Sequence, residues 1–388
     1  MRLGMHMNRF LLPILTVGVL SADEETQWLS DFWNNGELYA SKNNPFIQKV
    51  DLFGRLHYQF SHVDGRSGGQ DFDQNGGELR RFRMGAKIEF LNHFTLGARV
   101  NLEQGGFRND KLGYDSFDEM YLAYEVKDTF GVDELEVTAG RMKVNFGGEE
   151  HLSSKVIKTI ERSNLNNFFA PDRATGATVR VENGPLEVTT GLYTTHSDSE
   201  TLGSFDGGLA YYLSGEYDLP DAGDLVLDLM YANPEGDESE RDAFDGIEWA
   251  TALTYFQEED RYTLLANTTF GETQGGANVW GLVLLPTYYL IEDQVELAFR
   301  YQYARASENT LSAGSGSRGV RAAAKSRNVS VPKGDANHTF YGGVNVYLAK
   351  KNKAKLMFGV EYETLDSEAD GSADLDSVTL WGAFRAYF

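Results

Sequence analysis

The feature that most limits how this chain can fold is an alternation of apolar and polar residues with a period of two, repeated along most of the sequence. In VDLFGRLHYQF, Leu52, Leu56 and Tyr58 fall on one face, whereas Arg55 and His57 fall on the other. This period is typical of β-strands, because successive side chains point to opposite faces of a sheet. One face of almost every segment is apolar throughout, so each strand is predicted to have a dry and a wet side.

Sixteen segments follow this pattern, and their connections indicate how they are arranged. The segments span residues 48–63, 76–91, 94–105, 114–126, 134–146, 174–183, 186–196, 206–219, 223–233, 244–256, 261–272, 276–291, 293–305, 337–349, 354–365 and 375–388. Short turns alternate with long loops, and the long loops are residues 64–75, 147–173, 306–336 and 366–374. Short turns at one end and long loops at the other are typical of bacterial outer-membrane barrels, as is an even strand count. The sequence therefore predicts an all-β fold, a 16-stranded antiparallel transmembrane β-barrel.

The N-terminus has the parts of a secretory signal peptide. Two arginines precede an apolar core, Phe10–Leu20, and small residues follow as far as Ala22. This core is too short to span a bilayer, which needs about 20 residues. We expect a signal peptide over residues 1–22, a short periplasmic segment with a helix over residues 23–46, and the barrel over residues 47–388.

Charge and composition exclude several classes of function. The chain carries 35 basic and 58 acidic residues, and its net charge of −23 makes it a poor partner for nucleic acid. It contains no cysteine, which excludes disulfides and thiolate chemistry. We find no nucleophile elbow, P-loop or metal-binding signature, and therefore expect neither enzymatic activity nor a cofactor.

One acidic stretch partly matches a calcium-binding loop. In DFDQNGGE, Asp71, Asp73 and Asn75 occupy the first ligand positions. The closing bidentate glutamate is missing, because Phe82 stands at the twelfth position. A calcium site and an ordinary acidic, glycine-rich loop are both open interpretations.

The segment between the fifth and sixth predicted strands is basic and does not alternate. Its sequence, GRMKVNFGGEEHLSSKVIKTIERSNLNNFFAPDRATG (140–176), resembles the constriction loop of the phosphate-selective porin O/P family. The matching residues are Lys143, Phe146, Gly147, Ser153, Ser154, Ile157, Glu161, Arg162, Phe169, Ala170, Pro171, Arg173 and Gly176. The resemblance implies a porin whose third loop folds into the lumen and narrows it. It also implies a homotrimer in the Gram-negative outer membrane, with phosphate as a candidate solute.

The wet faces of the first strands and the basic loop supply candidates for an anion path. These are Arg81, Arg83, Lys87, Arg99, Arg141, Lys143, Lys155 and Lys158. The wet faces of later strands are richer in acids, including Asp228, Glu296 and Glu361, so we expect a basic wall facing an acidic one. Rows of arginine and lysine select anions in pores.

The alternative role of these cations is structural, because arginines in a barrel lumen can pair with carboxylates and hold the inward loop. We expect this role for Arg162 and Arg173, each of which is adjacent to an acid in the sequence. Glu161 and Pro171 belong to the same motif and are expected to shape the loop with them.

Two further segments indicate partners. The chain ends on an aromatic residue, Phe388, as bacterial outer-membrane barrels characteristically do, which implies recognition by the barrel-assembly machinery. The basic stretch GSGSRGVRAAAKSRNVSVPKG in the seventh loop could steer anions or contact lipopolysaccharide phosphates at the lipid surface.

Together these observations predict an outer-membrane porin for passive diffusion of small hydrophilic solutes, with a preference for anions. The alternatives are a general, non-selective porin and a plugged or enzymatic outer-membrane barrel.

Overall fold

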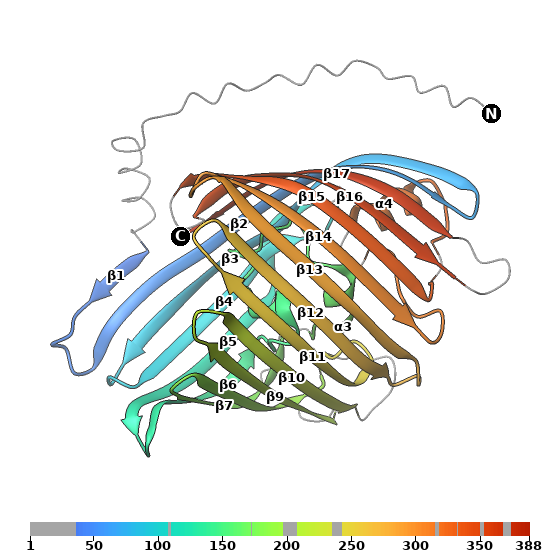
Figure 1. Ribbon diagram of the computed structural model, residues 1–388. Coiled ribbons are helices and arrows are strands. Elements are labelled where there is room, and N and C mark those ends of the chain that lie inside the picture. The colour runs from blue at the N-terminus through green and yellow to red at the C-terminus, as the bar shows by residue number, and fades with distance from the viewer. Residues whose placement is uncertain are drawn as a thin grey trace.

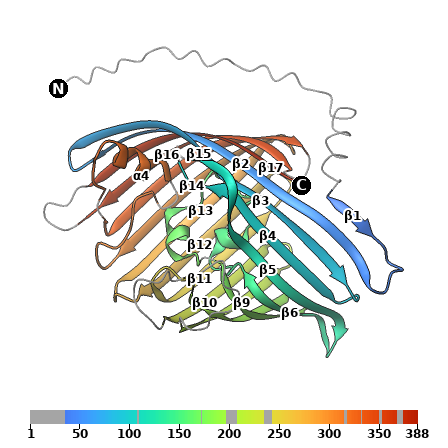
Figure 2. The ribbon, with the colours of Figure 1, turned by 180° about the vertical axis from the view of Figure 1, so that it is seen from behind.

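Sixteen antiparallel strands form a closed barrel, seen from two opposite sides in Figures 1 and 2. The computed structural model describes residues 36–107, 110–171, 173–196, 208–234, 243–314, 318–331, 333–349, 353–367 and 374–388. Each strand pairs with its neighbours in the sequence, and the last strand, β17 (Leu375–Tyr387), pairs with β2 (Ile47–Ser67) to close the ring. The predicted fold class is confirmed.

Most strand boundaries lie within a few residues of the alternating segments, but β2, β3 and β6 differ by four to six residues at one end. The strands between β2 and β17 are β3 (Gln70–Phe90), β4 (Phe94–Gln104), β5 (Lys111–Thr129), β6 (Val132–Met142), β7 (Ala174–Asn183), β8 (Leu186–Thr194), β9 (Gly208–Leu219), β10 (Gly223–Pro234), β11 (Ile247–Glu258), β12 (Tyr262–Thr273), β13 (Asn278–Ile291), β14 (Val295–Ala306), β15 (Ala336–Ala349) and β16 (Ala354–Asp366). The long connections lie at one end, which we call the long-loop end, and the turns lie at the other, the short-turn end.

The prediction of a first long loop over residues 64–75 is wrong. β2 and β3 continue through this stretch in register, with Asp64 opposite Asp73. A two-residue turn, Gly68 and Gly69, joins the strands, and both glycines have positive φ (57° and 77°). Glycine adopts this conformation without the steric cost that a Cβ would add.

A short additional strand, β1 (Glu37–Ala40), pairs with the short-turn end of β2. It continues the line of β17, because the Gly54 amide donates to the Phe388 carbonyl (3.1 Å) and the Leu52 amide donates to the Gly36 carbonyl (2.6 Å). The predicted signal peptide, and the part of the predicted periplasmic segment before residue 36, lie outside the described residues.

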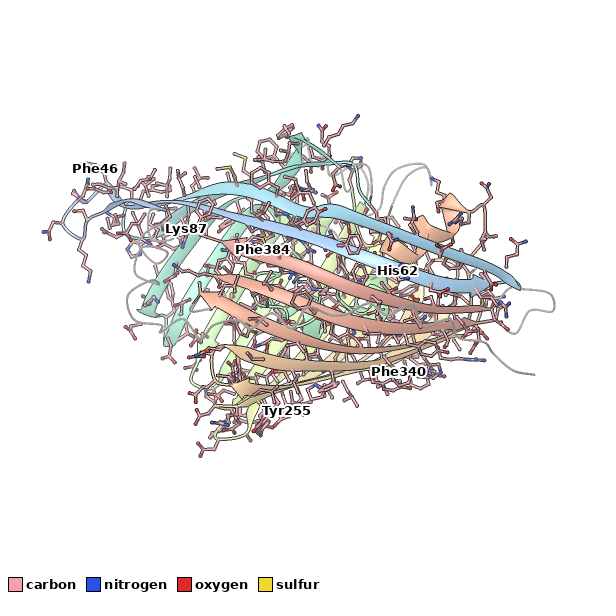
Figure 3. All side chains as sticks on the ribbon, turned by 90° about the horizontal axis from the view of Figure 1, so that it is seen from above. Phe46, His62, Lys87, Tyr255, Phe340 and Phe384 are labelled. Atoms are coloured by element: carbon pink, nitrogen blue, oxygen red, sulfur yellow. The ribbon has the colours of Figure 1, made fainter. Side chains whose placement is uncertain are left out.

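The two faces of the barrel differ as the alternation predicts. Large apolar side chains such as Tyr58, Leu253 and Phe340 are about half exposed on the outside, and Phe340 is labelled in Figure 3. On the inside, charged and polar side chains such as Arg55 and His57 are 6% and 1% exposed, because loops cover them. In the described part of the chain no helix is long and apolar enough to cross a membrane.

Two loops of the long-loop end carry the helices of the described residues. Loop three (residues 143–173) contains α2 (Gly148–His151) and α3 (Asn164–Phe169), and α3, which is labelled in Figure 1, contacts β13 and β14. Loop seven (residues 307–335) contains α4 (Arg318–Ser326), which contacts β2, β3 and β17. Both loops therefore reduce the open cross-section of the barrel.

Candidate functional site: a basic opening beside loop three

Loop three is held in the barrel by side chains of β14 to β17 that donate to its backbone carbonyls. The loop is irregular between its helices, and carbonyls outside regular structure need other donors when they are buried. Four consecutive strands supply them: Arg300 donates to the Glu161 carbonyl (2.6 Å), Asn345 to that of Lys158 (2.9 Å), Lys355 to that of Ile157 (2.7 Å), and Arg385 to that of Ile160. Three of these four donors are cations, so cations of the later strands bind the loop.

Three acids of the later strands also bind loop three, so the prediction that these three face the channel is wrong. Asp228 accepts from the Gly147 amide (2.9 Å) and lies 3.0 Å from His151. Glu296 pairs with Lys158 (2.8 Å), and Glu361 pairs with Arg300 (2.6 Å). Asp228, Glu296 and Glu361 are all at most 5% exposed, because the loop covers them. Lys158, one of the predicted path residues, is thereby placed in a structural ion pair.

A β-bulge brings an additional arginine to the loop. The register of β2 and β3 shifts between His57 and Tyr58, which leaves Arg80 as the extra residue of β3. Arg80 pairs with Glu161 at 2.8 Å, and Gln59 donates to the same carboxylate at 2.7 Å. Burial alone would raise the pKa of Glu161, but Arg80 and Arg81 lower it to about 2. The alternation hid Arg80, because a bulge reverses the side on which the following residues point.

Arg162, Arg173 and Pro171 occupy the positions expected of residues that shape the loop. Arg162 donates to the carbonyls of Glu149 (2.9 Å) and Leu152 (2.8 Å), and so ties the two halves of the loop together. Arg173 lies 3.1 Å from Asp118 on the barrel wall, where the loop returns to β7. Pro171 is buried at the same return.

Loop three leaves an opening along the wall formed by β2 to β6. The cavity there has a volume of about 230 Å³, and every residue that lines it is polar or charged. Its lining consists of Arg55, Arg81, Arg99, Glu119, Lys143, Asn145, His151, Ser153, Ser154, Arg162 and Arg173. Six of these side chains are arginine or lysine and one is glutamate, so the lining is strongly positive. We call this cavity the basic opening.

Several cations of this wall are paired with carboxylates. Asp118, which is 3% exposed, lies 3.1 Å from Arg83 and 2.5 Å from Arg99. Lys143 pairs with Glu150 at 2.8 Å. Burial lowers the pKa of Lys143 to about 8, although Glu150 opposes the shift. These pairs fix the wall but cancel part of its charge.

Three cations have no carboxylate within 4.0 Å among the residues that the structure describes. Arg55 donates to the Ser154 hydroxyl (2.5 Å). Arg81 is 7% exposed, and its Nε and Nη1 atoms lack hydrogen-bond partners in the described protein. Lys155 lies over the ring of Tyr387, 5.0 Å from its centre. Burial, and then repulsion by Arg55 and Arg99, lowers the pKa of Lys155 to about 8. Arg55 and Arg81 therefore carry uncompensated charge in the lining of the basic opening, and Lys155, the neighbour of Ser154, adds uncompensated charge next to it.

The remaining predicted path residues lie elsewhere on the inner wall. Arg141 is 5% exposed on β6. Lys87 lies at the short-turn end, where it pairs with Glu89 (3.1 Å) and lines a second cavity of about 330 Å³. This lower cavity is also lined by Glu125, Glu136, Glu187 and Glu216, against the cations Lys87, Lys143 and Arg180, so its lining is much less positive than that of the basic opening.

The predicted calcium ligands lie on a strand rather than in a loop. Asp71 pairs with Arg66 (2.7 Å), Asp73 with Arg327 of loop seven (2.8 Å), and Asn75 lies 2.8 Å from His62. Within the described residues, no three His, Cys, Asp or Glu side chains are grouped so that they could hold a metal ion. The three predicted calcium ligands are thus each bound to another side chain of the protein.

A closed barrel with an apolar outer face, a polar interior and an inward loop beside a small charged opening defines an outer-membrane porin. Solved channels share this fold. They include DcaP of Acinetobacter baumannii (14% identity, TM-score 0.56, covering 89% of this chain and 99% of that chain) and an anion-selective porin from Comamonas acidovorans (14%, 0.56, 87% and 99%). OprB of Pseudomonas putida is a further example (12%, 0.56, 87% and 94%). At these identities the likeness concerns the fold alone.

Residues 50–212 match the family described as phosphate-selective porin O and P. This match is to the same family that the residues of loop three resemble. No curated protein matches the sequence. The chain is thus a porin of the Gram-negative outer membrane, a channel rather than an enzyme, through which small hydrophilic solutes diffuse passively.

Proposed function

We propose that this porin prefers anions and that inorganic phosphate is among its solutes. The observation that carries the proposal is a set of three cations without carboxylate partners: Arg55 and Arg81 line a polar opening of about 230 Å³, and Lys155 lies next to it in loop three. Arginine and lysine in a narrow, water-filled passage attract anions, and low-dielectric walls strengthen the attraction. The paired cations Arg83, Arg99 and Lys143 add weaker fields along the same wall.

Transport requires that anions bind weakly enough to leave. Arg81 can offer its planar guanidinium to two oxygens of a phosphate, whereas Lys155 acts as a point charge. Asp118 and Glu150 lie behind the lining and reduce its positive charge, which keeps anion binding weak. An ion would therefore pass from one weak contact to the next along β2 to β6.

The proposal is tested by the block of single-channel current by phosphate in planar bilayers. We expect saturable block in the wild type and about tenfold weaker block in Arg81→Gln, because the variant loses a charge-assisted hydrogen bond. Lys87→Gln is the matched control: Lys87 lies on the same strand and inner wall but is paired with Glu89. Equal block in Arg81→Gln and wild type would contradict the assignment of Arg81 to the path.

A general, non-selective porin is the second candidate, and the lower cavity favours it. Its glutamates would attract cations and oppose the field of the basic opening. Currents that ignore phosphate and show no ion preference would support this candidate.

The assembly and its partners follow from the family. We infer a homotrimer embedded in outer-membrane lipid, with lipopolysaccharide near the long-loop end. Recognition by the barrel-assembly machinery is expected at Phe388, whose side chain is 38% exposed. Deletion of Phe388 should slow assembly of the trimer in cells, whereas normal assembly would contradict this role.

A further inference from the structure

A third cavity lies at the long-loop end, and its chemistry differs from that of the basic opening. It measures about 600 Å³ and is enclosed by α3 of loop three, residues 245–246 and 273–275, and loop seven. We call it the vestibule. Cavities of about 300–1,000 Å³ hold small organic molecules, whereas an inorganic ion would leave most of such a volume to water.

Two cations of loop seven, Arg321 and Lys333, line the vestibule. Both are exposed, and the described residues offer neither of them an ion-pair partner. The charge of Arg321 acts on Glu363, but that buried carboxylate already accepts from Asn164, Asn337 and the Gly314 amide. The two cations are thus available to a solute.

The helix that presents Arg321 is firmly attached to the barrel. Val320, Ala323 and Ala324 of α4 are at most 2% exposed. Gly319 lies so close to the Ser61 hydroxyl that a Cβ at this position would meet it at 2.8 Å. Just beyond the helix, Arg327 pairs with Asp73 at 2.8 Å. A fixed backbone lowers the entropic cost of binding at Arg321.

The rest of the lining combines apolar and amide side chains. Phe168 of α3 supplies apolar surface, with small contributions from the largely buried Leu165 and Leu311, whereas the basic opening has no apolar lining residue. Asn167 adds an amide, whose nitrogen donates to the Arg162 and Ser163 carbonyls. Asp245 adds one negative charge. Two cations, one carboxylate and an apolar face favour a monovalent anion that carries an apolar body.

We propose that the vestibule binds small organic monocarboxylates, with the carboxylate at Arg321 and Lys333 and the apolar body against Phe168. The porin would thereby concentrate organic anions before they reach the constriction. Its use in uptake rests on the proposed anion preference, but binding itself does not.

The proposal is tested by calorimetric titration of the full-length, detergent-solubilised porin with benzoate. Acetate, which has the same charge but little apolar surface, is the comparison. We expect saturable binding of benzoate, at least about tenfold tighter than that of acetate, because the ring adds buried apolar area. Arg321→Gln combined with Lys333→Gln should weaken benzoate binding at least about fivefold, since two exposed charge contacts are lost.

Lys325→Gln is the matched control, because Lys325 lies on α4 and is exposed but does not line the vestibule. Unchanged benzoate binding in this control, together with the loss in the double variant, would support the proposal. Equal affinity for benzoate and acetate, or equal benzoate binding in the double variant and the wild type, would overturn it. Because titration measures no current, a porin without anion preference that still binds benzoate would contradict the proposed function and leave the vestibule site standing.

Discussion

Replacing Arg300 by methionine should release loop three from the barrel wall. Arg300 is 3% exposed and makes more contacts to the loop than the other donors of β14 to β17. Its guanidinium donates to the Glu161 carbonyl (2.6 Å) and the Thr159 hydroxyl (3.3 Å), and it lies 3.5 Å from the Glu149 carboxylate. It also pairs with Glu361 at 2.6 Å.

The magnitude follows from what the substitution leaves behind. Methionine fills similar space but leaves Glu361, which is 5% exposed, without its cation. Removing one partner of a buried ion pair costs about 3–5 kcal/mol, because the remaining charge is desolvated. A cost of about 3 kcal/mol raises the ratio of displaced to docked loop by more than about 100-fold. Changing Glu361 to methionine as well should recover part of this cost, since no unpaired charge remains at that position.

Single-channel recording and thermal denaturation measure both effects. We expect Arg300→Met to show larger and noisier conductance steps, weaker phosphate block and a lower melting temperature. Arg66→Met is the control, because Arg66 pairs with Asp71 at the surface, where ion pairs contribute at most about 1 kcal/mol. Wild-type conductance and melting temperature in Arg300→Met would refute the view that this arginine holds the loop.

Three further predictions concern charge and backbone geometry. Asp118→Asn should increase anion preference, measured by reversal potential, because it removes the carboxylate that compensates the charge of Arg83, Arg99 and Arg173. An unchanged potential would count against a role of these arginines in anion preference. Anion preference should fall as the pH rises from 7 to 9, because Lys155 has a pKa of about 8 and loses its positive charge above it. Lys155→Arg should reduce this dependence, leaving the part due to Lys143, and a dependence of unchanged size would exclude Lys155. Gly140→Ala should lower the melting temperature, because φ is 133° and the new Cβ would collide with the Met120 carbonyl oxygen; no change would contradict the collision.

The strands could be predicted from the sequence because a lipid-facing barrel requires an apolar side chain at every second position. The error at residues 64–75 has a physical cause. Acidic and glycine-rich composition is typical of loops, but here β2 and β3 extend as a hairpin and pair through it. Pairing between strands is a tertiary effect that composition does not report.

The site could be predicted only in part. The basic side of the barrel could be predicted from the sequence, because Arg55, Arg81 and Arg99 lie on the wet faces of adjacent strands. The binding of the later strands' acids to loop three could not be predicted, because Asp228 contacts Gly147 only after loop three has folded across the lumen. Arg80 was missed because a bulge leaves no mark in the alternation itself.

The role of the uncompensated cations at and next to the basic opening is tested by the reversal potential of the reconstituted porin under a potassium chloride gradient. We expect a potential of anion-selective sign that shrinks when Arg55, Arg81 and Lys155 are replaced together by glutamine. A potential of cation-selective sign in the wild type, or the same potential in the triple variant, would contradict it.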